Sequence, residues 1–337
     1  MRLSVLDQST ALSGRPPEES IRETIELARL CDELGYLRFW VSEHHNHPSI
    51  VGTAPEILVA AIAATTRRIR VGSAGVMLPH YATLKVAEQF RVLEAIAPGR
   101  IDLGVGRAPG GDFRTALALN PRAETAADQF LAQLRDLMAW VVGTDLPQGH
   151  PFRGVEAHPA GPTAPEFWVL GSSDYGAQVA AHFGLPYCFA YFFSDGRGVE
   201  QALGLYRRHY RSSPGYPSPH AAICIWALAA ASEEEAQHQF TARAVWRILR
   251  DRNMLLALPT PEEAAAVALA PVEQAKLAQM RETAMVGAPH KVKRMIDELA
   301  ASRQVQEVAV VTWAHDAMVR RNSYSLLARE YGLGTSG

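Results

Sequence analysis

The sequence predicts an α/β fold of the (β/α)8 class, a TIM barrel of eight parallel strands. Short β-rich runs alternate with amphipathic segments at helical spacing along the chain. Eight strands, the helices between them and a final helix account for nearly all of the 337 residues. The strands are apolar and alternate little, which is typical of parallel strands covered on both faces. A doubly wound parallel sheet is the competing arrangement.

Each predicted strand is an apolar run bounded by turn residues. The first helix shows how helix ends are assigned, because Pro16 and Pro17 open it and Gly35 follows its last turn. Further helices are expected over about 54–66, 122–142, 173–184, 197–211 and 232–250. The predicted strands cover residues 3–7, 38–43, 69–78, 101–106, 167–171, 186–192, 221–230 and 307–313.

Two segments interrupt this alternation. Residues 143–166 are rich in proline and glycine and predict a long loop before the fifth strand. Residues 251–288 are rich in alanine and predict a helical insertion between strands seven and eight. We expect a single barrel domain over residues 1–337 that carries both segments as insertions at its mouth.

The composition narrows the classes of function. With 33 Lys and Arg against 35 Asp and Glu the formal net charge is −2, so no basic excess points to nucleic acid or to an anionic membrane. A hydrophobic content of 48% argues against a disordered chain. The three cysteines are far apart and fit neither a zinc pattern nor a disulfide framework. With no export signal recognised, we expect a cytoplasmic protein that acts on a small molecule.

Polar side chains follow several of the predicted strands at the point where each strand ends. In a barrel the carboxyl ends of the strands meet at one face, and active sites are built there. The residues at this face are Asp7, Gln8, Glu43, His44, His45, His47, His80, Arg107, Ser172, Ser173, Tyr175, Thr312, Trp313 and His315. Barrel stability does not require such a cluster, so we expect the active site here.

The densest polar group is SEHHNHP at the end of the second predicted strand. Histidine exchanges protons near neutral pH, so acid–base or hydrogen-bonding work on a bound ligand is one interpretation. A metal-dependent barrel hydrolase that uses His45 and His47 is a second, although strands five and seven end without a further histidine. Ordinary capping and loop residues are the third.

The segment GSSDYGA after the fifth strand has the features of an anion cradle. Gly171 lets the backbone approach a ligand, and Ser172 or Ser173 begins a helix whose free N–H groups and dipole favour a phosphate. Arg107 supplies a fixed positive charge whose planar fork matches a phosphate. The alternatives are an ordinary helix cap and a surface ion pair.

Two glycine-containing segments need separate interpretation. In GVGRAPGG, Pro109 stands where the dinucleotide fingerprint requires its third glycine, so the fingerprint fails. In the third strand, Ser73, Ala74 and Gly75 are small residues that weaken a strand. A flat ligand against the backbone would account for them, and so would a β-bulge or a tight barrel interior.

Together these segments resemble the flavin-dependent luciferase-like monooxygenases, the family of bacterial luciferase. The resemblance lies in VSEHHNHP (41–48), VGSAGVMLPHYATLKVAEQFRVLEAIAPGRIDLGVGRAPGGD (71–112), WVLGSSDYGAQVAAHFGLPYCFAYFF (168–193) and VGAPHKV (286–292). These segments stand in the family's order and spacing, and the block over 71–112 is long and specific. The resemblance covers essentially the whole chain and implies a (β/α)8 barrel that binds FMN.

The resemblance also implies roles for individual residues. His44 corresponds to the catalytic histidine near the reactive edge of the flavin, with Glu43 and His45 in support. Ala74 and Gly75 correspond to the dipeptide behind the isoalloxazine ring, which is often joined by a cis peptide bond. The residues that correspond to the phosphate cradle are Arg107, Gly171, Ser172, Ser173 and Tyr175. No metal is implied, and Gly176 departs from the family, in which serine is usual at this position.

The activity that the resemblance implies is oxygenation of a small organic substrate by reduced FMN and molecular oxygen through a flavin peroxide. A separate NAD(P)H:flavin reductase would supply the reduced FMN, and the family habit is a homodimer. Two alternatives within the fold are a non-catalytic flavin-binding protein and a hydride-transfer oxidoreductase that uses a deazaflavin. The hydrolase that uses His45 and His47 is the alternative outside it.

Overall fold

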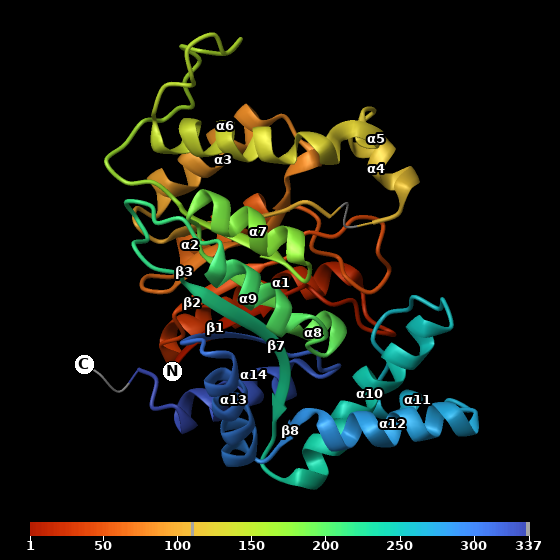
Figure 1. Cartoon of the computed structure of the whole chain (residues 1–337). Helices are drawn as coiled ribbons and strands as arrows, with labels where there is room; N and C mark the ends of the chain where they lie inside the picture. Colours follow the sequence, from red (N-terminus) through yellow and green to blue (C-terminus); the bar gives the residue numbers. More distant parts are fainter. Residues whose placement is uncertain (109–110, 335–337) are drawn as a thin grey trace.

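The computed structural model describes residues 1–108 and 111–334 and confirms the (β/α)8 barrel (Figure 1). Pro109, which breaks the dinucleotide fingerprint, lies outside the described residues. All the paired strands are parallel, and the ladder runs from β1 to β7, then to β9 and back to β1. The barrel strands are β1 (Arg2–Asp7), β2 (Arg38–Val41), β3 (Arg70–Met77), β4 (Ile101–Gly106), β5 (Glu166–Gly171), β6 (Tyr187–Ala190), β7 (Ala221–Ala229) and β9 (Glu307–Val311).

Helices cover the outside of this barrel (Figure 1). Gly35 ends the first helix with φ +86, as the sequence predicts. The predicted helix over 122–142 is divided into α5, η2 and α6, and a further short helix, α4, precedes it. The helices before β7 are α1 (Pro17–Leu34), α2 (Pro55–Thr65), η1 (Leu78–His80), α3 (Thr83–Ile96), α4 (Phe113–Leu119), α5 (Ala123–Ala126), η2 (Ala127–Gln129), α6 (Phe130–Val142), α7 (Asp174–Phe183), α8 (Tyr191–Ser194) and α9 (Val199–Arg208).

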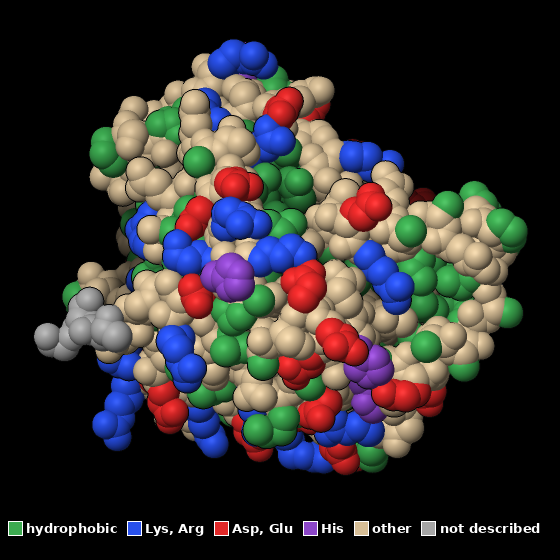
Figure 2. All heavy atoms as spheres, turned by 90° about the horizontal axis from the view of Figure 1, so that it is seen from below, with side chains coloured by type: hydrophobic (Ala, Val, Ile, Leu, Met, Phe, Trp, Pro, Cys, Tyr) green, Lys and Arg blue, Asp and Glu red, His purple; other side chains and the backbone are tan. Residues whose placement is uncertain are grey.

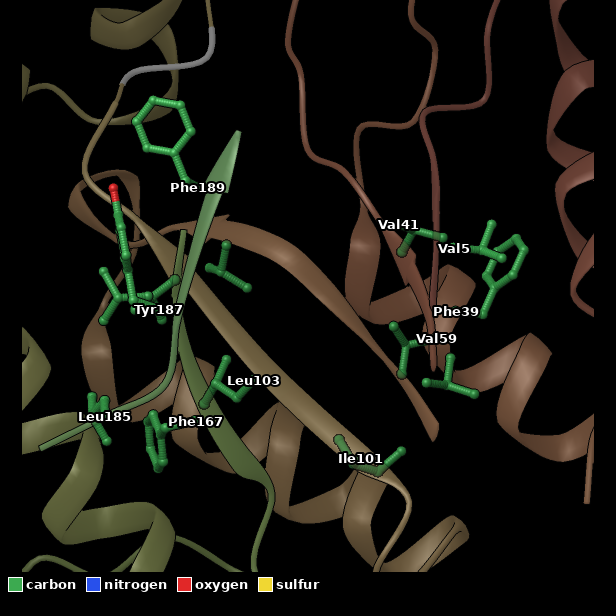
Figure 3. Close-up of a cluster of buried hydrophobic side chains, with 14 of the residues drawn as sticks. Val5, Phe39, Val41, Val59, Ile101, Leu103, Phe167, Leu185, Tyr187 and Phe189 are labelled. Carbon is green, nitrogen blue, oxygen red and sulfur yellow. The ribbon is translucent and has the colours of Figure 1, made fainter. Parts of the chain in front are cut away.

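The buried apolar side chains form two main layers, because successive strand residues point to opposite faces. The outer layer fills the space between strands and helices. Figure 3 shows part of it, where Val5, Phe39 and Val41 of β1 and β2 lie beside Val59 of α2. The inner layer fills the barrel and includes Trp40, whose neighbours in β2 face outward. The strands are therefore apolar on both faces, which explains their weak alternation.

The segment between β7 and β9 differs from the sequence prediction. It contains α10 (Glu233–Asp251), α11 (Pro261–Ala265), α12 (Pro271–Thr283), β8 (Met285–Gly287) and α13 (Pro289–Arg303), and α14 (Ala317–Glu330) follows β9. The seventh helix on the outer layer is α13, whereas the buried face of α10 packs with the inner layer. Figure 1 shows α10, α11 and α12 projecting beyond the barrel, away from α13 and α14. The insertion therefore begins at α10, and it carries a short strand that pairs with the end of β7.

The loop over 143–166 also lies elsewhere than expected. It connects the end of α6 to the start of β5, so it belongs to the face where the strands begin. Among the described residues, none from this loop lines the cavity at the opposite face. The expectation that this segment is an insertion at the mouth of the barrel is therefore wrong, because a loop that leads into a barrel strand starts at the opposite face.

A buried network of charged side chains closes the base of the barrel. Arg38 contacts Asp102 at 2.9 Å, Glu307 at 2.8 Å and Glu166 at 3.0 Å, and Arg70 contacts Asp102 as well. These residues lie at or near the first positions of β2, β3, β4, β5 and β9, so the network joins strands around the barrel.

The surface carries charges of both signs. On the face in Figure 2, Lys and Arg side chains lie interspersed with Asp and Glu, which agrees with a net charge of −2. In the described part of the chain no helix combines the length and apolarity that crossing a membrane requires.

Candidate active site

A cavity of about 450 Å³ opens inside the barrel at the face where the strands end. Its walls are mainly aromatic and aliphatic, with Trp40 from β2 and Trp226 from β7 among them. His44, His47 and Ala74 bring the ends of β2 and β3 to the wall. The predicted face of the barrel therefore contains a concave apolar site with a few polar groups, the usual character of a small-molecule site.

His44 lines the cavity just beyond the end of β2. Its backbone N–H donates to the Gly52 carbonyl at 3.0 Å, and its Nδ1 lies 3.2 Å from the Ser42 hydroxyl. Burial, with smaller contributions from His47 and His45, lowers the pKa of His44 to about 4. The ring is therefore neutral at neutral pH and is available to accept a proton.

Glu43 and His45 lie behind this wall and are absent from the described lining residues. The Glu43 carboxylate is 1% exposed and accepts hydrogen bonds from the Tyr81 hydroxyl (2.7 Å) and the Met77 N–H (3.1 Å). Its Oε1 also lies 2.8 Å from His45 Nε2. Glu43 and His45 thus fix the end of β2 to the end of β3. They position His44 from behind the wall and do not line the cavity themselves.

The peptide bond between Ala74 and Gly75 is cis, as the resemblance implies. The β3–β4 register shifts between Ser73 and Val76, so a bulge occurs at this dipeptide and Ala74 faces the cavity. A Cβ on Gly75 would lie 2.7 Å from the Gly104 carbonyl carbon. The small residues thus reflect both a bulge and a close approach of β3 to β4.

The predicted anion cradle lies at the neighbouring strand ends. The Arg107 guanidinium stacks over the Tyr175 ring, with 4.4 Å between its Cζ and the ring centroid. Arg107, Ser172 and Ser173 are exposed, and the side chain of Ser173, the N-cap residue of α7, makes no capping hydrogen bond. Ala108 and Leu170 adjoin these residues and line the cavity, so the cradle is at its rim. Gly171 ends β5 at the same rim.

Of two less defined candidates, Trp313 and His80, only Trp313 is among the described lining residues of the cavity. Trp313 lines the cavity and donates a hydrogen bond from Nε1 to Gln8 Oε1 at 3.1 Å. His80 lies in η1 and packs edge-on against His45, with ring centroids 5.9 Å apart. No group of three or more His, Cys, Asp or Glu side chains within residues 1–108 and 111–334 is arranged to hold a metal ion.

The arginines of α10 are site residues that the sequence motifs did not indicate. Arg243, Arg247 and Arg250 line the cavity together with Trp246. Their spacing of four and three residues places them on one face of the helix. This spacing is the feature of the sequence from which they could have been found. The periodicity alone did not show that this face closes a cavity, because α10 was expected on the outside of the barrel.

Comparison with known proteins shows the family to which the chain belongs. A family model described as luciferase-like monooxygenase matches residues 1–306. The chain belongs to the luciferase-like monooxygenases. This membership agrees with the barrel, with the cis dipeptide and with the order of the segments that carry the resemblance.

Individual relatives and solved structures match over nearly their whole length. The N-acetyl-S-alkylcysteine monooxygenase of Bacillus subtilis (strain 168) is 34% identical over 331 residues, covering 97% of each chain. The crystal structure of apo-MsnO8 has a TM-score of 0.88 at 35% identity and covers 98% of both chains. The oxygenating constituent of 3,6-diketocamphane monooxygenase from Pseudomonas putida, solved in complex with FMN, has a TM-score of 0.74 at 19% identity. The match covers 100% of this chain and 98% of that one and shows the shared fold.

Proposed function

We propose that the protein is a flavin-dependent monooxygenase that uses reduced FMN and molecular oxygen to oxygenate a small organic substrate. The observation that carries this proposal is one cavity wall that brings neutral His44 beside the cis Ala74–Gly75 dipeptide. The residues that we assign to an anion cradle lie at the rim of the same cavity. Together they provide a group for proton transfer, a surface for a flat ring and a site for a phosphate.

The residues present fit FMN. Ala74 presents only a methyl group to the cavity, and Gly75 packs closely against β4 behind it, so an isoalloxazine ring would fit against this part of the wall. Arg107, Ser172, Ser173 and Tyr175, with the N–H groups of α7, would hold the phosphate. A Cβ on Gly176 would meet only the Tyr187 ring, at 3.7 Å, so serine also fits there. Bound reduced FMN supplies the electrons that place one oxygen atom in the substrate and the other in water.

The chain's own groups would then position, desolvate and exchange protons. His44 is neutral, so it would accept a proton from the substrate and return it within the cavity. Glu43 and His45 would hold the backbone that carries His44. Trp40, Trp226 and the other apolar side chains of the wall would exclude water from the reacting groups.

Flavin titration tests the cofactor part of the proposal, and oxygen uptake then tests the reaction. We expect oxidised FMN to bind in calorimetry and Arg107→Met to weaken binding by about tenfold or more, because a charge-assisted contact to the phosphate is lost. Arg114→Met, on the exposed start of α4, is the matched control and should bind FMN normally. Oxygen uptake with chemically reduced FMN should then increase when an N-acetyl-S-alkylcysteine, the substrate class in one relative's name, is added. No FMN binding would overturn the proposal.

We further propose a cytoplasmic homodimer that receives reduced FMN from a separate NAD(P)H:flavin reductase. Exposed apolar side chains on the neighbouring helices α2 and α3 support the dimer, with Ile57 66% exposed and Val92 and Ile96 each 47%. Sedimentation of the wild type and of Ile57→Lys would test it. A monomeric wild type would contradict this part of the proposal.

A further inference from the structure

The cavity wall has a marked charge asymmetry. Arg243, Arg247 and Arg250 line it from one face of α10, and none of the described lining residues is Asp or Glu. Burial lowers the pKa of both lining histidines, His44 and His47, which favours their neutral form. The charge of the wall therefore comes from the arginines. The wall opposite the cis dipeptide is therefore cationic within an otherwise apolar cavity.

Arg243 is the residue whose charge lacks compensation. It is 7% exposed, and it has no hydrogen bond or ion pair with any described residue. Its guanidinium Cζ lies 4.3 Å from the centroid of the Trp226 ring. Burying a charged group without a partner is costly, and arginine does not relieve the cost by losing its proton. The site therefore favours an anion beside Arg243.

A second donor beside Arg243 also lacks a partner. Trp226 Nε1 is buried and has no acceptor among the described residues. Trp226 and Arg243 line both the main cavity and a smaller one of about 140 Å³ next to it. Two unpaired donors on stacked side chains, at the wall of a cavity, are suited to one ligand with several acceptor oxygens.

The neighbouring carboxylate does not fill this role. Asp195 accepts two hydrogen bonds from Arg247, at 2.7 and 2.5 Å, and its side chain is 63% exposed. Asp195 still acts on Arg243 at longer range, but Arg247 and Arg250 oppose its effect. Arg197 is also close enough to act on Asp195. Arg250 pairs with its neighbour Asp251, at 3.4 Å, and lies over the Trp246 ring. The cluster thus keeps an excess of positive charge.

We propose that Arg243, with Trp226 and Arg247, binds a carboxylate or sulfonate group of the substrate. The substrate is then an amphipathic anion whose apolar part lies along the aromatic wall toward His44. The cradle proposed for the flavin phosphate, Arg107 and Tyr175, belongs to other elements, because Arg107 follows β4 and Tyr175 lies in α7. This inference rests on the proposed function only where it calls the anion a substrate.

Calorimetry on the flavin-free protein tests the site without any chemistry. The probes are octanoate and octanamide, which differ in charge and hardly in size. We expect octanoate to bind about tenfold or more tightly than octanamide, because only the carboxylate pairs with Arg243. Arg243→Met should remove this preference, and Arg294→Met, an exposed arginine of α13, should keep it. Equal binding of the two probes by the wild type would overturn the proposal, and so would a preference that survives in Arg243→Met.

Two further measurements, of FMN affinity and of oxygen uptake, distinguish this inference from flavin-phosphate binding and from the proposed function. Arg243→Met should bind oxidised FMN as the wild type does, and a loss of FMN affinity equal to that of Arg107→Met would overturn the inference by assigning the anion to the flavin. Carboxylate preference with no oxygen uptake on any substrate would support the anion site and overturn the proposed function. Oxygen uptake that is indifferent to substrate charge would overturn this inference alone.

Discussion

His44 has the position and charge state that proton transfer requires. It lines the cavity, its ring is neutral at neutral pH, and its backbone is fixed by Gly52. We expect His44→Ala to lower turnover by about 10²–10⁴-fold, the usual contribution of a general acid or base. Stopped-flow measurement of substrate-dependent oxygen use would show this. Flavin affinity should change little, and His290→Ala on the exposed face of α13 should behave as the wild type. Wild-type turnover in His44→Ala would contradict the assigned role.

The same residue makes stability depend on pH in a defined direction. The pKa of His44 is about 4 in the folded protein, against an ordinary value of 6.5. Between these values the unfolded chain binds more protons, so stability is full above pH 6.5 and is lost as pH falls toward 4. From pH 7 to 4.5, His44→Gln should lose about 2 kcal/mol less unfolding free energy than the wild type. Urea unfolding at the two pH values measures this, with His290→Gln as the control. Parallel losses in all three proteins would show that His44 titrates normally.

At this scale, residue type and strand position predicted part of the site. His44 and Ala74 line the cavity because both follow or interrupt strands that end at its wall. Glu43 and His45 do not line it, because β2 ends at Val41 and the chain then turns, so neighbours in sequence face different sides. Which of several adjacent polar residues faces a ligand depends on that turn, and the strand pattern does not specify it.

At the scale of elements, β3 and β4 lie so close together beside the β-bulge that glycine is required at position 104. A Cβ on Gly104 would overlap the Ser73 carbonyl oxygen, whereas one on Gly106 would meet nothing within 4 Å. We expect Gly104→Ala to lower the unfolding free energy by about 1–3 kcal/mol, the typical cost of overpacking. Gly106→Ala on the same strand should be close to neutral. Thermal unfolding of the two variants provides the comparison, and equal melting temperatures would be inconsistent with this account.

The order of helices between β7 and β9 shows what periodicity does not reveal. Both α10 and α13 have one apolar face, so both fit the pattern of a barrel helix. The apolar face of α13 covers the outer layer, while that of α10 packs over the inner layer at the open end. An amphipathic pattern indicates that a face is buried, but the surface that buries it is set by tertiary packing. For this reason the cationic wall was not foreseen.

At the scale of the whole molecule, the barrel was predictable because it depends on the number and order of the strands and not on the exact residues at which they end. Errors of a few residues at the strand ends, such as 38–43 against Arg38–Val41, leave eight parallel strands in the same order. Strand β8 was missed because its three residues give no detectable pattern, and it lies outside the closed barrel. The closed ring has a ligand cavity at one end and a charged network at the other, with Trp40 between them. Trp40 lines the cavity, and its Nε1 donates to Asp102 at 2.8 Å.

This division predicts that stability can be lost at the base without a change in the site. Arg38 holds Asp102, Glu166 and Glu307 together, so Arg38→Met would remove the cation that the three carboxylates share. Arg70 would still pair with Asp102 and Glu166, and His220 with Glu307, so the buried negative charge would be only partly compensated. We expect the unfolding free energy in urea to fall by about 3–5 kcal/mol, the cost of breaking a buried ion pair on one side. Lys85→Met, which removes an exposed pair with Glu88, should change it by less than about 1 kcal/mol. Where Arg38→Met remains folded, its affinity for oxidised FMN should equal that of the wild type, because the cavity lies beyond Trp40. A weakened affinity in the folded variant would show that base and site are coupled.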